Sequence, residues 1–543
     1  MKRADAGDAV DAAHPAACFH REVLTCMKWS DIRRDFLDAL QTAPHLRFVE
    51  PKKLWRHSQE ALGKWVLSQV ARDTRVDKDT QASVAFFPTK AMISAGTYDE
   101  QLIRDISLKC EASSSPEVVA GIKQLLTKFN LSKRCEDAAA EVLLELESTS
   151  PSAYCRPTLR VIGAEEEQSR TASQRRVQGS VAVIGVEWPS HIARHMRRGC
   201  PAVSIPLAAY RKLDMCYRHF ADKAERVHYP RLDYDARFAL RAAALAMRYE
   251  GCLATGSLQL CADTRLKQHL HASGYHVMDL CASPINAYMG SPKVCSHRNR
   301  GSDSGSFLEC EDTPNYFCSA FFDTDRYFGS LGSALKFDVA SAYNSREINP
   351  NQKPLLLTLD VPYDEDLCEK LFSKLLVDMQ HAEAAATASA KEVKPPLPYV
   401  ADYVLVLPLW WDVPMQRAKV LFTEEGSSPP PPPPASSSVS TESTAGEKAA
   451  ARLRDIIKER SATLQEGYMV PYEWPQRLAE AAGDRWVSFD GVFVGGSYEY
   501  FCTITNKWLS GVTATEVIGL AQPRAQEGGP ALKPLLDHFY GCQ

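Results

Sequence analysis

Four consecutive residues, Asp360-Val361-Pro362-Tyr363, follow an apolar run from Leu355 to Leu359. The run predicts a strand buried on both faces, and Pro362 predicts its end because proline cannot donate to a central ladder. A carboxylate here can accept a hydrogen bond from an amine, and an aromatic ring can stack on a flipped base. The pattern predicts methylation of an exocyclic amine such as adenine N6, with Asp360, Pro362 and Tyr363 as catalytic residues. The alternative is an ordinary strand-to-helix turn, where Asp and Pro are common.

The elements around this motif predict an α/β domain. Acidic residues 364–366 suit the first turn of a helix, and apolar residues at helical spacing follow them up to Met379. A loop between such a strand and helix lies where open parallel sheets bind ligands. The predicted strands of this domain are His276–Leu280, Phe317–Phe321, Ala334–Phe337, Leu355–Leu359, Tyr403–Leu409, Trp486–Val494 and Thr515–Leu520.

Composition divides the chain into five parts. Residues 1–18 are rich in Ala and Asp and are predicted to be disordered. Residues 19–163 follow helical spacing and carry no motif for chemistry, whereas 164–275 hold a predicted strand, Ser180–Val186, and helices from Ile205 to Met247. The α/β domain spans 276–525, with polar or proline-rich inserts at 290–310 and 424–448, and residues 526–543 form a tail.

Charge and cysteine usage restrict the function classes. The net charge of −4 over 543 residues means that a nucleic-acid reader would need a local basic cleft. The 16 cysteines form no CxxC pair and are predicted to be reduced thiols of an intracellular protein. No apolar stretch is long enough to span a membrane, and the acidic N-terminus argues against a mitochondrial transit peptide.

Three further features have both a functional and a plain interpretation. Trp188 precedes Arg194, Arg197 and Arg198, which could contact phosphates or simply form a solvated basic helix. The run Pro429–Pro434 could bind a protein partner as a polyproline helix or act as a linker. We predict no metal site, because the spacing of the nearest candidate ligands matches no closed zinc site. Those ligands are Cys295, His297, Cys310 and Cys318.

Three motifs together resemble one known family in order and spacing. They are Cys281-Ala-Ser-Pro-Ile-Asn-Ala-Tyr288, Cys318-Ser-Ala-Phe-Phe-Asp-Thr-Asp-Arg-Tyr-Phe-Gly-Ser330 and Asp360-Val-Pro-Tyr363. The family is the cap-specific adenosine N6-methyltransferase, also called the phosphorylated-CTD-interacting factor. The resemblance covers roughly the last 340 residues.

The resemblance implies a class I (Rossmann-like) methyltransferase sheet preceded by a helical module, with S-adenosyl-L-methionine as cofactor. It implies methylation of the first transcribed adenosine beside an m7G cap. Asp323 and Asp325 would be candidates for the ribose hydroxyls of the cofactor, with turn capping as the alternative. The implied cofactor-binding residues are Ala282, Ser283, Pro284, Asn286, Asp323, Asp325, Phe328, Gly329, Ser330 and Asp360.

A cap-binding enzyme also needs aromatic side chains for the cationic m7G ring and basic side chains for the triphosphate. Capped RNA is then the expected partner and the nucleus the expected location, with the cytoplasm as alternative; the oligomeric state is left open. The candidate substrate-binding residues are Trp188, Arg194, Arg197, Arg198, Lys507 and Trp508.

Two departures from the family pattern leave alternatives open. Residues 1–150 show no WW module, and Val361 stands where the family has its first proline. The change could abolish activity and leave an RNA-binding or assembly scaffold. It also brings the motif closer to that of the rRNA adenine dimethyltransferases, which suggests N6,N6-dimethyladenosine as the product. A third interpretation is methylation of an internal RNA or DNA adenine.

Overall fold

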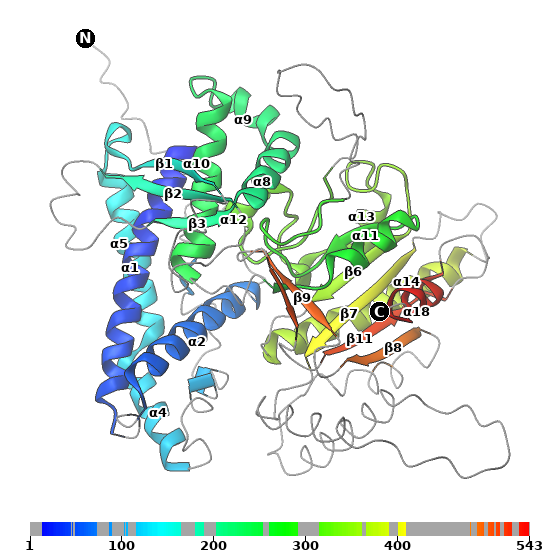
Figure 1. Ribbon diagram of the computed structural model, residues 1–543, viewed down its shortest axis with the longest axis horizontal. Coiled ribbons are helices and arrows are strands. Elements are labelled where there is room, and N and C mark those ends of the chain that lie inside the picture. Colours follow the sequence, from blue (N-terminus) through cyan, green and yellow to red (C-terminus); the bar gives the residue numbers. More distant parts are fainter. Residues whose placement is uncertain are drawn as a thin grey trace.

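A helix-rich half of the molecule lies beside a half built around a five-stranded sheet (Figure 1). The chain is therefore mixed α/β with a helical N-terminal module, as the sequence predicts. The computed structural model describes residues 13–44, 46, 49–72, 86–88, 102–103, 105–106, 116–163, 180–188, 202–253, 260–290, 314–360, 365–389, 400–408, 478, 486–493, 498–503, 507–510, 515–523 and 531–541.

Helix α1 (Pro15–Thr42) is the central element of the helical half. Its apolar residues Trp29, Phe36 and Leu40 recur at helical spacing and are fully buried. The helix starts at Pro15, inside the terminus predicted to be disordered, because Ala17 and Cys18 are buried in the core. Helices α2 (Pro51–Arg72), α4 (Pro116–Phe129) and α5 (Leu131–Ser148) pack against α1.

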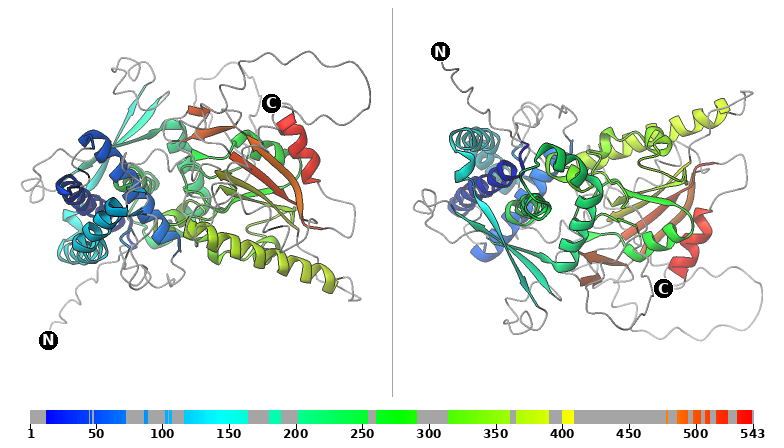
Figure 2. Two further views of the ribbon diagram at one scale, coloured as in Figure 1. Left: turned by 90° about the horizontal axis from the view of Figure 1, so that it is seen from below. Right: turned by 90° about the horizontal axis from the view of Figure 1, so that it is seen from above.

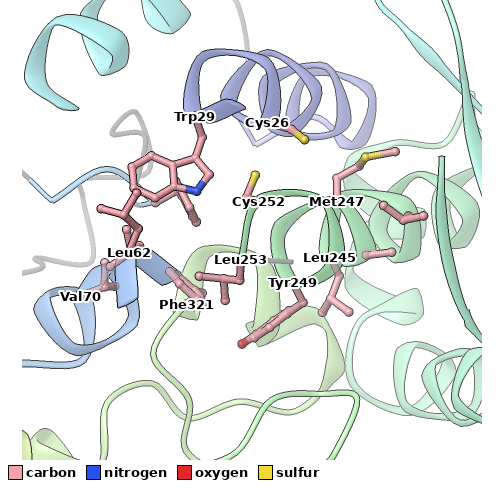
Figure 3. Close-up of a cluster of buried hydrophobic side chains, with 14 of the residues drawn as sticks. Cys26, Trp29, Leu62, Val70, Leu245, Met247, Tyr249, Cys252, Leu253 and Phe321 are labelled. Carbon is pink, nitrogen blue, oxygen red and sulfur yellow. The ribbon is translucent and has the colours of Figure 1, made fainter. Parts of the chain in front are cut away.

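A second group of helices joins α1 to the sheet. The region from Ile205 to Met247, predicted as two helices joined near Tyr229-Pro230, contains three helices, and the last one continues into a π-helix, η3 (Met247–Leu253). Figure 3 shows Trp29 of α1, Leu62 of α2 and Cys252 of η3 in one buried cluster with Phe321. The helical half and the segment around Phe321 thus share a core. The helices of this group are α8 (Leu207–Phe220), α9 (Asp222–His228) and α10 (Tyr234–Ala246).

An antiparallel sheet with the order β1-β2-β3 also belongs to the helical half. The predicted strand Ser180–Val186 is confirmed as β2 (Val181–Glu187). The sequence did not predict its neighbours β1 (Arg156–Ile162) and β3 (Val203–Pro206). Most side chains of β1 are exposed and β3 has four residues, so neither gives a clear apolar alternation.

The main sheet has the order β5-β6-β7-β11-β8. Strands β5, β6 and β7 pair in parallel, whereas β11 is antiparallel to both β7 and β8. The predicted buried strand is confirmed as β6, with its leucines almost fully buried. The bounds are β5 (His276–Asp279), β6 (Leu355–Asp360), β7 (Ala401–Pro408), β8 (Val487–Phe493) and β11 (Thr515–Leu520).

Helices cover both faces of this sheet (Figure 2). The long helix α14 (Glu365–Ser389) buries its predicted apolar stripe on one face, against Leu355, Leu357 and Leu359. Helices α11 (Thr264–Ala272) and α18 (Leu532–Gly541) cover the other face, where Leu356 lies. Because side chains alternate along a strand, Thr358 and Asp360 share the α11 face with Leu356.

Two predicted strands of this domain are wrong. Phe317–Phe321 is extended but forms one isolated bridge, between Phe317 and Ser330. Ala334–Phe337 contains a short 3-10 helix, η6 (Ala334–Lys336), whose first turn is capped by Ser333. Both segments pack apolar side chains into the cores, which gives a strand-like composition without a ladder.

A small antiparallel sheet with the order β10-β9-β4 completes the described structure. Its strands are β4 (Leu260–Cys261), β9 (Glu499–Cys502) and β10 (Lys507–Ser510). Within the described ranges, no helix is long and apolar enough to cross a membrane, and no cysteine forms a disulfide.

Candidate active site

The carboxyl ends of β5 and β6 bring two carboxylates to one face of the sheet. Asp279 ends β5 and pairs in register with Thr358, two residues before Asp360 at the end of β6. Both strands run in the same direction, so their ends meet at one edge. The predicted catalytic residue Asp360 therefore lies where parallel sheets bind ligands.

Asp279 is buried and fully engaged. It forms an ion pair with Lys267 of α11 (Nζ–Oδ1 2.6 Å), accepts the backbone N–H of Tyr288 (2.6 Å) and accepts the hydroxyl of Thr358. Burial opposes its charge, but the Lys267 ammonium and these hydrogen bonds hold the pKa of Asp279 below its ordinary value. These contacts favour the anionic form of Asp279 and tie β5, β6 and α11 together.

Asp360 has a different environment. Its Oδ2 accepts the backbone N–H of Ala262, directly after β4, at 2.6 Å. The residue is partly exposed at the sheet edge. Burial of the carboxyl raises the pKa of Asp360 to about 7, with Asp279 adding to the rise and Lys267 and Ala262 opposing it. Asp360 can therefore change its charge near neutral pH.

The small sheet carries an exposed aromatic next to this edge. Cys261, which precedes Ala262, pairs with Phe501 of β9, and Phe501 pairs with Trp508 of β10. Trp508 is 39% exposed, and the guanidinium of Arg265 lies 4.3 Å from the centre of its ring. Trp508, a predicted substrate residue, thus belongs to the small sheet, which is linked to Asp360 of β6 through the Ala262 N–H.

The loop after β5 contains four of the predicted cofactor residues, and several hydrogen bonds hold it in place. The Ser283 N–H donates to Asn286 Oδ1 (2.6 Å), the Ala282 N–H donates to the carbonyl of Cys318 (3.0 Å), and Pro284 is buried. The half-buried Lys212 of α8 donates to the carbonyls of Ile285 (2.8 Å) and Ala287 (2.7 Å). This loop continues to Tyr288, which binds Asp279, so it lies at the same edge.

Phe328, Gly329 and Ser330 form a turn beside β5. Phe328 is buried against Tyr217, and Ser330 Oγ lies 2.7 Å from Ser319 Oγ. The N–H of Cys318 donates to the carbonyl of Asp279 (2.8 Å), so this segment runs along the end of β5. Cys318 is fully buried there, and the other candidate zinc ligands lie outside the described residues.

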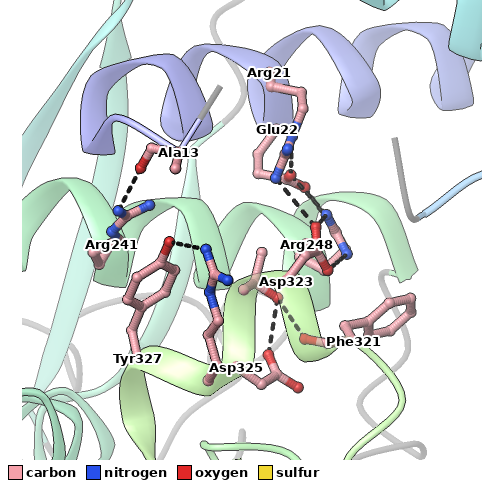
Figure 4. A network of polar contacts seen from close by, with 11 residues as sticks. Ala13, Arg21, Glu22, Arg241, Arg248, Phe321, Asp323, Asp325 and Tyr327 are labelled. Carbon is pink, nitrogen blue, oxygen red and sulfur yellow. Dashed lines mark hydrogen bonds and ion pairs between the residues drawn. The ribbon is translucent and has the colours of Figure 1, made fainter. Parts of the chain in front are cut away.

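Asp323 and Asp325 are not brought to the edge where Asp279 and Asp360 meet. Figure 4 shows Asp323 of α12 (Phe322–Asp325) in a network with Arg21 and Glu22 of α1 and Arg248 of η3. Arg248 binds both Glu22 (2.6 Å) and Asp323 (3.0 Å), and Arg21 binds Asp323 (3.1 Å).

Asp325 has partners of its own. It accepts the hydroxyl of Tyr249 (2.7 Å), and burial raises the pKa of Asp325 to about 7. Because both carboxylates bind groups of the protein, the geometry favours a structural role over the predicted ribose contact.

Only some of the other predicted residues lie in the described part of the chain. Trp188 follows β2 and packs on the core of the helical half, so it does not belong to the small sheet with Trp508. Lys507 lies in β10, where the structure describes its backbone alone. Pro362, Tyr363, Arg194, Arg197 and Arg198 lie outside the described residues.

Sequence reasoning missed Lys267, Lys212 and Ala262. Ala262 acts through its backbone, which no side-chain pattern reports. Lys267 carried a weak signal, because it lies beside Leu266 and Leu270, the buried residues of a short helix. A lysine on the buried side of a helix needs an anion as partner.

One comparison with known proteins gives a match. A family model described as "Phosphorylated CTD interacting factor 1 WW domain" matches residues 212–376, less than a third of the 543 residues. The matched segment runs from α8 into α14 and includes Asp279, Asp360 and the loop between Ala282 and Asn286. It links the chain to that family. No curated protein matches the chain.

The description of the match qualifies one expectation. We predicted no WW module in residues 1–150, and the match lies beyond them, but its description names a WW domain. The matched segment contains helices and the parallel strands β5 and β6.

Proposed function

We propose that the chain is an S-adenosyl-L-methionine-dependent RNA methyltransferase that modifies N6 of the first transcribed adenosine beside an m7G cap. The proposal joins the family match over residues 212–376 to the geometry at the ends of β5 and β6. It includes capped RNA as partner and the nucleus as location.

The strand order of the main sheet supports a class I methyltransferase fold. In the order β5-β6-β7-β11-β8, β11 alone runs antiparallel, inserted between β7 and β8. One reversed strand near the end of an otherwise parallel sheet is typical of this class. The target motif then follows β6, and the cofactor loop follows its neighbour β5, so the two meet at one edge.

One observation carries the catalytic assignment. One carboxylate oxygen of Asp360 accepts the Ala262 N–H, its partner among the described residues, and the residue as a whole is partly exposed. The other oxygen can accept an N–H of the adenine amine. This contact favours the pyramidal nitrogen, whose lone pair is available to attack a methyl group.

The protein's own groups also account for the proton. The amine loses a proton when it gains a methyl group. A carboxylate with a pKa of about 7 can accept a proton near neutral pH and release it to water. The Ala262 N–H keeps Asp360 in place throughout, because a backbone group does not change rotamer.

The residues at this edge fit a cationic methyl donor. Asp360 is partly exposed, and Ala282 and Ser283, in the loop after the neighbouring strand β5, have small side chains. S-adenosyl-L-methionine, when bound, supplies an activated methyl group on a positively charged sulfur. The loop between Ala282 and Asn286, held by Lys212, would bind it, and Asp360 would face its charge.

Trp508 is the best placed residue for the m7G ring. An indole face attracts a cationic base, and Trp508 is an exposed aromatic on β10 of the small sheet, whose strand β4 is followed directly by Ala262, the backbone partner of Asp360. Its carboxylate neighbour Glu499 lies two residues from Phe501 on the same face of β9.

A methyl-transfer assay with labelled S-adenosyl-L-methionine tests the proposal. The substrates are matched RNAs that begin with m7GpppA, GpppA, pppA and m7GpppG. Transfer confined to m7GpppA is the expected result. Transfer to internal adenines would move the function to another substrate, and cofactor binding absent altogether would favour an RNA-binding scaffold.

The product of the same assay decides the number of methyl groups. Val361 in place of the first proline makes N6,N6-dimethyladenosine the product that we propose. A reaction that stops at the monomethyl stage with enzyme in excess contradicts the dimethyl product and leaves the activity itself intact.

A further inference from the structure

We propose that Lys267 is a positioning residue of this site: it holds the ends of β5 and β6 side by side through Asp279, and its charge offsets the repulsion between the two carboxylates that meet there. The inference rests on the proposed function, because Asp360 is taken as the group that binds the amine.

Lys267 of α11 is linked to β5 directly and to β6 through Asp279. It projects from α11, its side chain is 4% exposed, and its ammonium binds Asp279 at 2.6 Å. Asp279 also accepts the Thr358 hydroxyl of the neighbouring strand, two residues before Asp360. The ion pair therefore lies beside Thr358 of β6, two residues before the end of that strand.

Lys267 offsets part of the negative charge at this edge. Asp279 and Asp360 share the α11 face, and each disfavours the charge of the other. Lys267 opposes the rise in the pKa of Asp360, and Asp360 in turn contributes to the raised pKa of Lys267. The titratable groups that face Asp360 from the packed elements of the described structure are Lys267 of α11, Asp279 of β5, Cys261 of β4, Cys281 after β5 and Tyr498 before β9.

The nearby Lys212 has different partners from Lys267. It donates to two backbone carbonyls of the loop after β5, and burial lowers its pKa. It adds no ion pair to Asp279 or Asp360 among the described contacts. Lys267 is thus the cation that is matched to the two carboxylates.

The test compares three variants by the pH at which Asp360 titrates. Lys267→Met removes the cation, so the midpoint should rise by roughly one pH unit or more. Asp279→Asn removes the like charge, so the midpoint should fall. Lys267→Arg keeps a cation and should restore most of the wild-type midpoint. Opposite shifts from two partners of one ion pair are not expected if the pair only stabilises the fold.

Two readouts keep this inference separate from the proposed function. The first is the carboxyl carbon signal of Asp360 in aspartate-labelled protein, assigned by its loss in Asp360→Asn. The second is the pH profile of methyl transfer. Lys64→Met, which breaks a half-buried pair with Asp105 (3.0 Å) in the helical half, is the matched control and should leave both unchanged.

The outcomes are distinct. Shifts of opposite sign in the titration midpoint, measured from the carboxyl signal, support the inference. They do so even if the protein transfers no methyl group, and in that case only the proposed function fails. Shifts of the same sign, or no shift in folded Lys267→Met and Asp279→Asn, overturn it. If Lys267→Met does not fold, the direction of the Asp279→Asn shift decides.

Discussion

At the scale of single residues, the central feature is a pair of similar carboxylates in unlike surroundings. Asp279 is held as an anion by Lys267, whereas burial raises the pKa of Asp360 to about 7. Such a separation of pKa values is typical of functional sites, because one group is fixed in charge and the other is ready to change it.

The role of Asp360 predicts a difference between two substitutions. Asp360→Ala should lower methyl transfer on the order of a hundredfold, since it removes a directed electrostatic contact. Asp360→Asn keeps an oxygen that can accept the amine hydrogen but cannot titrate. It should retain measurable activity with a flatter pH profile between pH 6 and 8, as about 7 is the pKa that it removes.

Thermal unfolding is the control for both variants. Equal melting temperatures for Asp360→Ala and Asp360→Asn would show that the activity lost in Asp360→Ala is lost through chemistry and not through unfolding. An Asp360→Ala protein that is folded and fully active would remove Asp360 from the mechanism.

His276 predicts a loss of stability in acid. Burial, with His271 and Lys353 nearby, lowers the pKa of His276 from 6.5 to about 4. The unfolded chain therefore binds a proton that the native protein excludes, so stability is full above pH 6.5 and declines as the pH falls toward 4. Through this group, the free energy of unfolding should fall by about 2 kcal/mol when the pH is lowered from 7.5 to 5.

Urea denaturation at both pH values measures this effect. His276→Phe should lose less stability than the wild type between pH 7.5 and 5. An equal loss in both proteins would contradict the assignment.

Much of the residue-scale site could be predicted. Asp360 follows a buried strand, and the loop from Ala282 to Asn286 follows a second one, so their meeting is a consequence of parallel pairing. The partners Lys267 and Ala262 could not be predicted, since they depend on how α11 and β4 pack. The surroundings of Asp323 and Asp325 do not fit the ribose contact expected for them. Arginines of distant segments bind Asp323, which the local sequence could not show.

At the scale of elements, strand composition was a good guide where the strand is central. Strand β6 is apolar because both its faces are covered. The segments Phe317–Phe321 and Ala334–Phe337 are equally apolar but pack against cores without a ladder, and local sequence cannot distinguish the two cases. The strand β1 was not predicted for the opposite reason: it forms a ladder, but most of its side chains are exposed.

The turn at Gly329 makes a testable contribution to the packing of α8. Gly329 has φ +100°, and a Cβ there would lie 2.4 Å from the ring of Phe220. Gly329→Ala should lower the free energy of unfolding by roughly 1–3 kcal/mol, from the strained backbone together with the clash. Gly163→Ala is the control, because a Cβ there meets nothing within 4 Å.

Equilibrium unfolding in urea compares the two glycine variants. The expected effect of Gly163→Ala is within about 0.5 kcal/mol of the wild type. Equal stability of Gly329→Ala and Gly163→Ala would show that the turn tolerates a side chain.

At the scale of the whole molecule, a buried ionic network joins the two halves. Arg21, Glu22, Arg248 and Asp323 pair two cations with two anions between α1, η3 and α12 (Figure 4). Arg248 is fully buried, and its charge has no access to water. The halves are therefore expected to unfold together.

Removing one member should be costly. Arg248→Met leaves Glu22 and Asp323 short of a cation, so the free energy of unfolding should fall by about 3–5 kcal/mol. The matched control is Arg34→Met, which breaks an exposed pair with Asp31 (2.8 Å) and should cost at most about 1 kcal/mol. Calorimetry measures both, and equal melting temperatures for the two variants would contradict a structural role of the network.

The most direct test of the account is methyl transfer to matched RNAs beginning with m7GpppA and m7GpppG, with wild-type protein and Asp360→Ala in parallel. We predict that wild-type protein labels N6 of the first adenosine of m7GpppA alone, and that the variant loses this label on the order of a hundredfold. A wild-type protein that binds S-adenosyl-L-methionine and RNA but transfers no methyl group to either substrate would contradict it.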